Sequence, residues 1–345
     1  MSKGAYIGIN NSARKIKAGY IGVNNIAYKI KMAYIGIGGV ARPCWNSGNG
    51  LTYYGTAPTS LSVARDGLAA TTVGNYALFG GGYSSSTSYT NIVDAYDSSL
   101  IRTIPTSLSV GREDLEATTV GNYALFGGGK TTYSSSTLGY TNTVDAYDKN
   151  LTRTTPTPLS IRRNGLAATT VGNYALFGGG FYQNTSYSTI DAYDENLTRT
   201  TSASLSVARR FLQATTVGNY ALFGGGYIST SSTGYTNTVD AYDGSLTRTI
   251  PTSLSVGRNS LAATTVGNYA LFNGGYISST NYPDAVVDAY DENLTKTTPT
   301  PPSAAKNGLA ATTVGNYALF GGGMKGNYIS SDTLYYSLID VYTIL

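Results

Sequence analysis

Two sets of charged residues recur at fixed places in this chain of 345 residues. Each cation of the first set stands three residues before a leucine that opens a repeated phrase: Arg65, Arg112, Arg163, Arg209, Arg258 and Lys306. Each acid of the second set lies in a short apolar run that ends in Tyr: Asp94, Asp145, Asp191, Asp240, Asp288 and Asp340. Guanidinium groups bind carboxylates and phosphates through paired hydrogen bonds. The sequence therefore predicts either a ring of cations that holds an anionic ligand or six ion pairs with the acids, and it leaves both open.

Other residues that could do chemistry are scarce. The chain has no histidine and a single cysteine, Cys44, so the commonest general base and zinc ligand is missing and no disulfide can form within the chain. The acids in strand-like runs recur in every repeat, as structural residues do, whereas a catalytic pair would differ from its copies. Glu116 and Asp284 are isolated exceptions. We therefore expect a protein that is not an enzyme and that has no catalytic residues, metal site or cofactor.

These residues are positioned by six near-copies of the phrase LAATTVGNYALFGGG. The copies begin at Leu68, Leu115, Leu166, Leu212, Leu261 and Leu309, at intervals of 46 to 51 residues. A period of this length, with four short strand-like runs in each unit, is typical of a β-propeller with one blade per repeat. The sequence predicts an all-β protein: a six-bladed β-propeller over residues 51–345, preceded by a small domain over residues 1–50.

The first full repeat shows the expected order of strands within a blade. Run A (68–73) and run B (76–81) flank Gly74-Asn75, the two-residue connection of a tight hairpin. Run C (92–96) and run D (100–104) follow, joined by a turn that begins with Asp. We therefore expect four antiparallel strands in each blade.

The two ends of the propeller predict how the ring closes. The last repeat ends on run C, at residues 338–342, and LTYYG at residues 51–55 occupies the place of a run D before the first repeat. We expect residues 51–55 to join the last blade as its fourth strand. This closure removes the open sheet edge between the first and the last blade.

The two faces of the propeller differ in sequence. Because antiparallel strands alternate in direction, the A–B and C–D turns lie on one face and the B–C and D–A loops on the other. The A–B turns are Val-Gly-Asn in all repeats, whereas the B–C loops vary from nine residues (181–189) to fifteen (324–338). These loops are rich in Tyr, Ser, Asn and Gly, a composition typical of recognition loops, although polar loops can also simply face water. The candidate ligand-binding tyrosines are Tyr83, Tyr133, Tyr182, Tyr227, Tyr276 and Tyr328.

Residues beside the ring of cations also vary between repeats. They include Asp66, Glu113, Asn164, Arg210 with Phe211, and Asn307. They belong to the D–A loops, on the same predicted face as the variable B–C loops. Variation beside an otherwise repeated residue favours a role in contact with a ligand.

The glycine pair that ends run B, the Tyr-Asp that ends run C and the Arg shortly before run A resemble the kelch repeat. The resemblance covers residues 51–345 and implies a kelch-like propeller without fixing a function. Kelch repeats carry an aromatic residue in run D, where this chain has Thr or Arg, so we expect tyrosines of run C to fill the space between blades. Copper oxidases of this type need histidine ligands, and the Ser-x-Asp-x-Gly-x-Thr-Trp box of sialidases is absent, so both resemblances to enzymes fail.

Residues 5–45 hold a second repeat, of 14 residues, with Tyr6, Tyr20 and Tyr34 in phase. Each copy has two short runs around Asn-Asn or Gly-Gly, which predicts three small β-hairpins. Residues 1–50 also hold seven of the 23 cations of the chain and none of its 19 acids, so we expect this domain to meet a different partner. The wording AYIGIN, GYIGVN and AYIGIG resembles the YIG-type repeats in virion or tail proteins of phages and prophages of Gram-positive bacteria.

These resemblances imply an adhesion protein of a phage or phage-tail-like particle. Residues 1–50 would attach it to other particle proteins, and the variable loops would bind a host-surface glycan or an anionic wall polymer. The alternative is a purely structural capsid decoration or baseplate component. The sequence has neither the apolar core of a signal peptide nor the roughly 18 apolar residues of a membrane span. We therefore expect synthesis in the host cytoplasm and no contact with a membrane. Nucleic acid is not favoured, and a homo-oligomer is compatible with the pattern.

Overall fold

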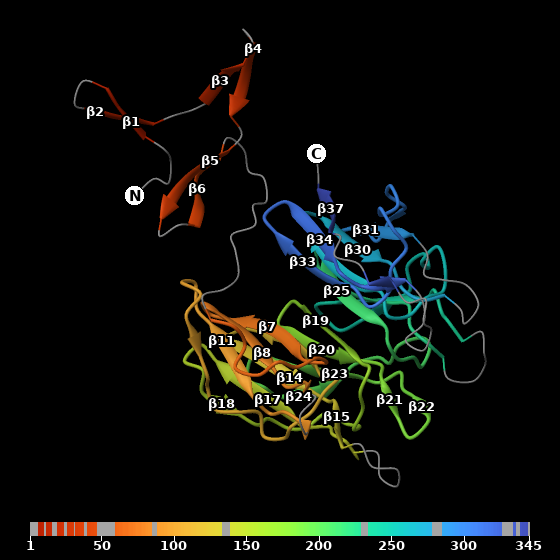
Figure 1. The fold of residues 1–345 in the computed structure, drawn as a ribbon. Coiled ribbons are helices and arrows are strands. Elements are labelled where there is room, and N and C mark those ends of the chain that lie inside the picture. Colours follow the sequence, from red (N-terminus) through yellow and green to blue (C-terminus); the bar gives the residue numbers. More distant parts are fainter. Residues whose placement is uncertain are drawn as a thin grey trace. The chain divides into compact units, whose positions relative to one another are not determined.

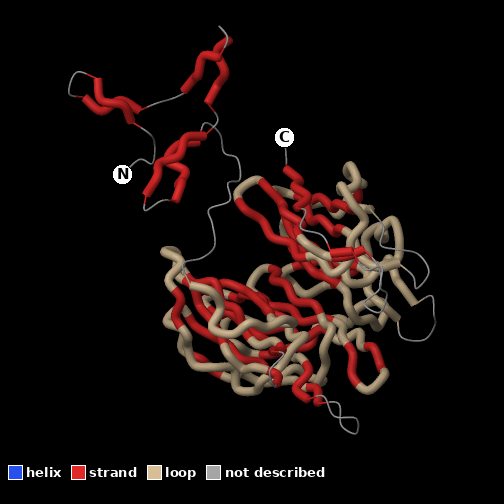
Figure 2. Tube along the Cα trace, in the orientation of Figure 1, coloured by secondary structure: helices blue, strands red, loops and turns tan. Residues whose placement is uncertain are grey.

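The structure is a computed structural model that divides the chain into two compact units, residues 1–60 and 61–345. All secondary structure that it describes is β-strand (Figure 2). Within that part of the chain, no helix is long and apolar enough to cross a membrane. The described residues are 6–9, 12–15, 19–23, 26–30, 32–37, 40–46, 59–84, 88–132, 139–228, 234–277, 285–325, 334–335 and 339–343.

The first unit contains three β-hairpins, as the 14-residue repeat predicts. Each hairpin is an antiparallel sheet of two strands that pairs with no other described strand. Isolated hairpins of two strands are in general marginally stable in water. The hairpins are β1 (Tyr6–Ile9) with β2 (Ser12–Lys15), β3 (Gly19–Val23) with β4 (Ile26–Ile30), and β5 (Met32–Ile37) with β6 (Val40–Asn46).

The second unit is a six-bladed β-propeller, and its blades are antiparallel sheets (Figure 1). Blade 1 contains β7 (Ala69–Val73), β8 (Tyr76–Gly80), β11 (Val93–Tyr96) and β12 (Arg102–Thr103). Blade 2 contains β13 (Glu116–Val120), β14 (Tyr123–Gly127), β17 (Val144–Asp148) and β18 (Arg153–Thr154). Blade 3 contains β19 (Ala167–Val171), β20 (Tyr174–Gly178), β23 (Ile190–Tyr193) and β24 (Arg199–Thr201).

The remaining blades repeat this order. Blade 4 contains β25 (Gln213–Val217), β26 (Tyr220–Gly224), β27 (Val239–Asp243) and β28 (Arg248–Thr249). Blade 5 contains β29 (Ala262–Val266), β30 (Tyr269–Asn273), β31 (Val287–Asp291) and β32 (Lys296–Thr297). The described strands of blade 6 are β33 (Ala310–Val314), β34 (Tyr317–Gly321) and β37 (Ile339–Thr343). The predicted strands A to D are therefore present in this order in blades 1 to 5, and strands A to C are described in blade 6.

Among the described residues, four B–C loops contain short two-stranded hairpins of their own. They are β9 (Tyr83–Ser84) with β10 (Ser88–Tyr89), β15 (Lys130–Thr132) with β16 (Gly139–Tyr140), β21 (Phe181–Tyr182) with β22 (Thr185–Ser186), and β35 (Met324–Lys325) with β36 (Leu334–Tyr335). The residue that follows the glycines of each strand B forms a bridge with a D–A loop residue, as Tyr227 does with Arg210. The B–C and D–A loops therefore lie together on one face, which we call the loop face.

The first strands of neighbouring blades contact one another, so strand A of each blade is innermost. Threonine hydroxyls join these strands: the Oγ1 atoms of Thr71 and Thr119 lie 2.9 Å apart, and equivalent contacts recur at the next four interfaces. At each interface, the third residue of one strand A meets the fourth residue of the next. The centre of the propeller is thus held by repeated polar contacts between blades.

The apolar core is divided into layers between blades. Between blades 2 and 3, Val120 and Val144 pack with Phe177 and Tyr193 of the next blade. The rings of Phe177 and Tyr193 meet edge to face with centroids 6.0 Å apart, a favourable geometry for an aromatic pair. A Cβ at Gly127 would lie only 2.8 Å from the Phe177 ring, so the repeated glycine leaves room for this ring. This packing confirms that tyrosines of strand C fill the space between blades.

Within the described residues, blade 6 exposes the face that in the other blades packs against the next blade. Val314 is 46% exposed, whereas the equivalent Val120 of blade 2 is 1% exposed. On the first blade, Phe79 is half-buried, whereas the equivalent Phe126 is fully buried. These two terminal faces carry the two complementary halves of an inter-blade layer. The closing strand predicted at residues 51–55 lies outside the described residues.

Candidate ligand-binding face

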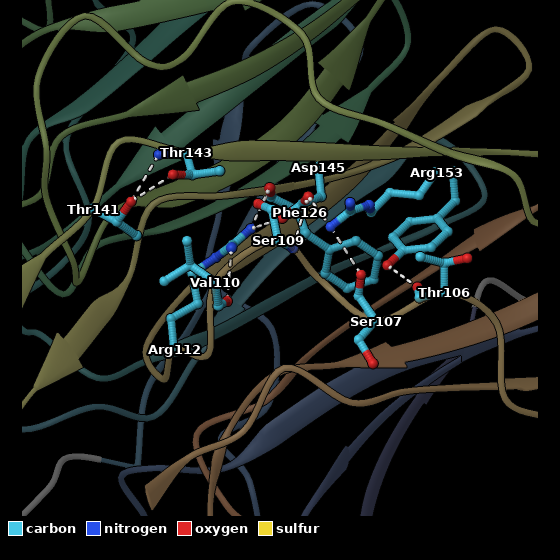
Figure 3. A network of polar contacts seen from close by, with 11 residues as sticks. Thr106, Ser107, Ser109, Val110, Arg112, Phe126, Thr141, Thr143, Asp145 and Arg153 are labelled. Atoms are coloured by element: carbon cyan, nitrogen blue, oxygen red, sulfur yellow. Dashed lines mark hydrogen bonds and ion pairs between the residues drawn. The ribbon is translucent and has the colours of Figure 1, made fainter.

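The predicted ring of cations is buried in ion pairs with the acids of strand C. In blade 2, Arg112 Nη2 donates a hydrogen bond to Asp145 Oδ2 at 2.8 Å, and both side chains are fully buried (Figure 3). The same nitrogen donates to the carbonyl of Phe126, and Nη1 donates to the carbonyl of Val110. The pairs are Arg65–Asp94, Arg112–Asp145, Arg163–Asp191, Arg209–Asp240, Arg258–Asp288 and Lys306–Asp340, at 2.7 to 2.9 Å. Of the two roles that the sequence left open, the geometry is that of ion pairing.

Each acid also has further donors. Asp145 accepts from the backbone N–H of Ser109 at 3.1 Å and lies 3.4 Å from Arg153 Nη1 (Figure 3). Burial lowers the pKa of the Arg112 guanidinium, and the charge of Asp145 opposes this shift. Because the D–A loop supplies both Ser109 and Arg112, the network fixes this loop to the blade. It supplies a rigid base for the residues that stand above it on the loop face.

Aromatic rings and two arginines form a continuous chain on the loop face, which we call the aromatic belt. It consists of Arg162, Tyr182, Tyr140, Phe181, Arg210, Tyr227, Tyr235 and Tyr276, in this order of contact. Consecutive aromatic rings lie 5.2 to 6.3 Å apart between centroids. The belt crosses the B–C loops of blades 2 to 5, and most of its rings are half-buried. It therefore presents ordered, partly exposed aromatic surface at the edge of the loops.

Arg210 is at the centre of the belt. Its guanidinium carbon lies 4.1 Å from the centroid of Phe181, 5.1 Å from that of Tyr227 and 5.7 Å from that of Phe211. Phe211 is 39% exposed and has a positive φ of 53°, a backbone conformation that is uncommon for an aromatic residue. Its amide donates to the carbonyl of Gly165 in the preceding D–A loop, which holds it there. The cation and an exposed ring are thus presented together.

The loops of blades 1 and 2 carry acids where blade 4 carries Arg210. The equivalent positions are Asp66 and Glu113, and Glu113 Oε1 accepts a hydrogen bond from Lys130 at 3.0 Å. Nearby, burial raises the pKa of Glu116 to about 8, and the charge of Asp114 adds to this shift. The loop face therefore has Asp66 and the Glu113–Lys130 ion pair at blades 1 and 2, and arginines among aromatic rings at blades 3 and 4.

The structure locates four of the six candidate tyrosines. Tyr182, Tyr227 and Tyr276 belong to the aromatic belt, and Tyr83 is 38% exposed beside Tyr89 at 5.5 Å. The other two, Tyr133 and Tyr328, lie outside the described residues. The tyrosines were predicted as binding residues, and that role stays a prediction.

Sequence reasoning missed Tyr140, Phe181, Tyr235 and Arg162. Arg162 could have been found, because the equivalent residue is Ala or Gly in every other repeat: Ala64, Gly111, Ala208, Gly257 and Ala305. The contacts of Tyr140 with Phe181 and Tyr182 join two neighbouring loops, and no spacing within one loop predicts them. Departure from the repeat was therefore the most useful signal in the sequence.

No known family model matches this chain, and no curated protein is significantly similar to it. Within the described residues, no group of three or more acidic, histidine or cysteine side chains could hold a metal ion. The proposals below therefore depend on the geometry of the loop face.

Proposed function

We propose that this protein is a non-enzymatic adhesion component of a phage or phage-tail-like particle, and that its loop face binds a host-surface glycan. Residues 1–50 attach it to other particle proteins. The observation that carries the proposal is the aromatic belt, a set of ordered rings supplied by the variable B–C loops. The repeated residues build the propeller, and the loops that vary most in length and sequence lie on the loop face.

The chemistry of the belt suits a saccharide. The face of an aromatic ring is electron-rich and its edge is not, so the C–H groups on the flat side of a sugar can pack against a tyrosine. Tyrosine also adds a hydroxyl for hydrogen bonds and loses little conformational entropy on binding. Half-buried rings such as Tyr227 and Tyr276 are already held by neighbouring side chains. Ordering before binding reduces the entropic cost of binding.

The rigidity of the base supports the same function. Six buried ion pairs anchor the D–A loops, and interlocked aromatic layers join consecutive blades. Loops on such a base can differ in sequence without changing the fold. This division of roles between a repeated base and varied loops is what an adhesion protein with an adaptable specificity requires.

The test is binding of the full chain to host cell-wall glycans, measured beside a variant in which Tyr227 and Tyr276 are changed to alanine. We expect the variant to bind about tenfold or more weakly, because ring truncation at the centre of a binding surface costs more than about 1 kcal/mol. A control variant, Lys149→Ala and Glu195→Ala, changes exposed residues of C–D turns on the opposite face and should bind normally. Glycan binding that both variants retain would contradict the proposal.

A purely structural role makes a different prediction. A decoration or baseplate component would bind no glycan, and many copies of it would coat the head or the baseplate. Counting the copies per particle and their location separates the two functions, since few copies at the tail tip favour the adhesion protein.

A further inference from the structure

The loop face carries two pairs of consecutive arginines, and in each pair one arginine is fully buried and the other is not. In the pair Arg209-Arg210, Arg209 is fully buried and donates to Asp240 at 2.8 Å, whereas Arg210 pairs with no carboxylate among the described residues. In the pair Arg162-Arg163, Arg163 is fully buried against Asp191, and Arg162 is exposed without a carboxylate partner in the same part of the chain. One member of each pair builds the blade, and the other is free to meet an anion.

The surroundings of Arg210 make an unpaired cation costly. Its Nε is buried and has no hydrogen-bond partner within the described structure. Burial lowers the pKa of its guanidinium, and the nearest titratable groups that oppose this shift are Tyr227 and Tyr140. The Nε atoms of Arg65, Arg112, Arg163 and Arg209 also have no partner in the described structure, but each of those guanidinium groups pairs with an aspartate, whereas Arg210 pairs with no described carboxylate. Buried donors in proteins are normally satisfied. Stacking on Phe181 at 4.1 Å stabilises the cation but satisfies none of its N–H donors.

Arg162 stands at the other end of the same group of rings. Its guanidinium carbon lies 5.9 Å from the centroid of Tyr182, and Tyr182 reaches Phe181 through Tyr140. Tyr140 is buried between the half-buried rings of Tyr182 and Phe181, so a ligand that stacks on those two rings has a cation beside each of them. Neither arginine is repeated in the other blades, where the residues equivalent to Arg210 are Asp, Glu or Asn. These two arginines therefore give this side of the loop face cations that the equivalent positions of the other blades lack.

We propose that Arg210 and Arg162 each provide an oxyanion subsite for an acidic oligosaccharide, one whose sugar rings carry carboxylates. This inference rests on the proposed glycan binding and narrows its ligand. The sugar rings pack on the aromatic belt, and a carboxylate at each end accepts hydrogen bonds from the guanidinium donors there. A carboxylate fixed directly to a sugar ring fits this arrangement, because the ring and the anion are then held at a constant distance. Planar guanidinium groups bind carboxylates with two parallel hydrogen bonds.

The test compares a charged probe with its neutral ester: an oligogalacturonate and its fully methyl-esterified form, in which each carboxylate becomes an uncharged methyl ester. Binding of each to the full chain is measured by calorimetry for the unmodified protein and for Arg210→Gln, Arg162→Gln and Lys149→Gln. Lys149→Gln removes one exposed cation from the opposite face and is the matched control. We expect Arg210→Gln to weaken binding of the acid about 10- to 100-fold, because hydrogen bonds to a charged group contribute about that much to affinity. The affinity for the ester should not change.

The possible outcomes separate this inference from the proposed function. Equal binding of acid and ester, or equal loss in Arg210→Gln and Lys149→Gln, overturns the subsite while glycan binding stands. If the protein binds no saccharide of any kind, the proposed function fails as well. Tighter binding of a single-stranded oligonucleotide than of the oligogalacturonate overturns the acidic-saccharide subsite, because stacked rings and arginines can also bind nucleic acid. Thermal melting shows whether Arg210→Gln is folded, and Arg210→Lys, which keeps the charge without the planar fork, should recover part of the affinity.

Discussion

Arg163→Met tests whether the buried cations are structural. Arg163 Nη2 donates to Asp191 Oδ2 at 2.8 Å and to the carbonyl of Phe177 at 3.1 Å. The substitution leaves Asp191 with Ser160 and with Arg199 at 3.2 Å, so part of its charge stays compensated. Removing one partner of a buried pair costs about 3–5 kcal/mol, and we expect about 3–4 kcal/mol here. For a unit of this length, that loss lowers the melting temperature by about 5–7 °C.

The assay is urea unfolding followed by fluorescence and circular dichroism, with Arg162→Met as the control. The control changes the adjacent arginine, which is exposed and unpaired with any described carboxylate, so its stability should change by less than about 0.5 kcal/mol. Adding Asp191→Asn to Arg163→Met should recover part of the loss, because it removes the uncompensated charge. If Arg163→Met costs less than about 1 kcal/mol, the ion pair is not structural, and a ligand role for the ring of cations returns.

Three further predictions follow from the described contacts. Burial raises the pKa of Glu116 from 4.5 to about 8, so the folded protein keeps this proton at pH values where the unfolded chain has lost it. The free energy of unfolding should therefore fall as pH rises from about 4.5 to 8. Unfolding measured across this range should be less pH-dependent in Glu116→Gln, and an unchanged slope would refute the shift. Gly127→Ala should lower stability by about 1–3 kcal/mol, because its Cβ would meet the Phe177 ring at 2.8 Å; wild-type stability in urea unfolding would contradict this packing. Thr312 of blade 6 and Thr72 of blade 1 are equivalent to the threonines that touch at the five described interfaces. If the ring closes, cysteines at these two positions should form a disulfide within one chain once the native cysteine is removed. Disulfide-linked dimers on a non-reducing gel would show that the terminal faces do not close the ring.

The repeat made the fold predictable from the sequence. A phrase that recurs every 46 to 51 residues predicts the blades. Strand C tyrosines such as Tyr147 and Tyr193 were expected to fill the space between blades, and their packing against residues of the preceding blade confirms this. Six copies of one pattern reinforce each other, so an error in one blade is corrected by the others.

The roles of individual charges were not predictable in the same way. Arg112 and Asp145 are separated by 33 residues, and their burial decides between an ion pair and a ligand site. Burial depends on the packing of two loops and a strand, which no local spacing encodes. The aromatic belt likewise depends on contacts between neighbouring loops, such as that of Arg210 with Phe181. These features appear only once the blades are assembled.

The most direct test of the central claim is tyrosine footprinting with a host cell-wall glycan. Nitration of the full chain with and without the glycan, read by mass spectrometry, reports which rings the ligand covers. We predict protection of Tyr182, Tyr227 and Tyr276 in the aromatic belt and no change at Tyr174 and Tyr220, which begin strand B beside the A–B turns of the opposite face. Protection of Tyr174 and Tyr220 alone, or equal nitration of all five rings while the glycan is bound, would contradict binding at the loop face.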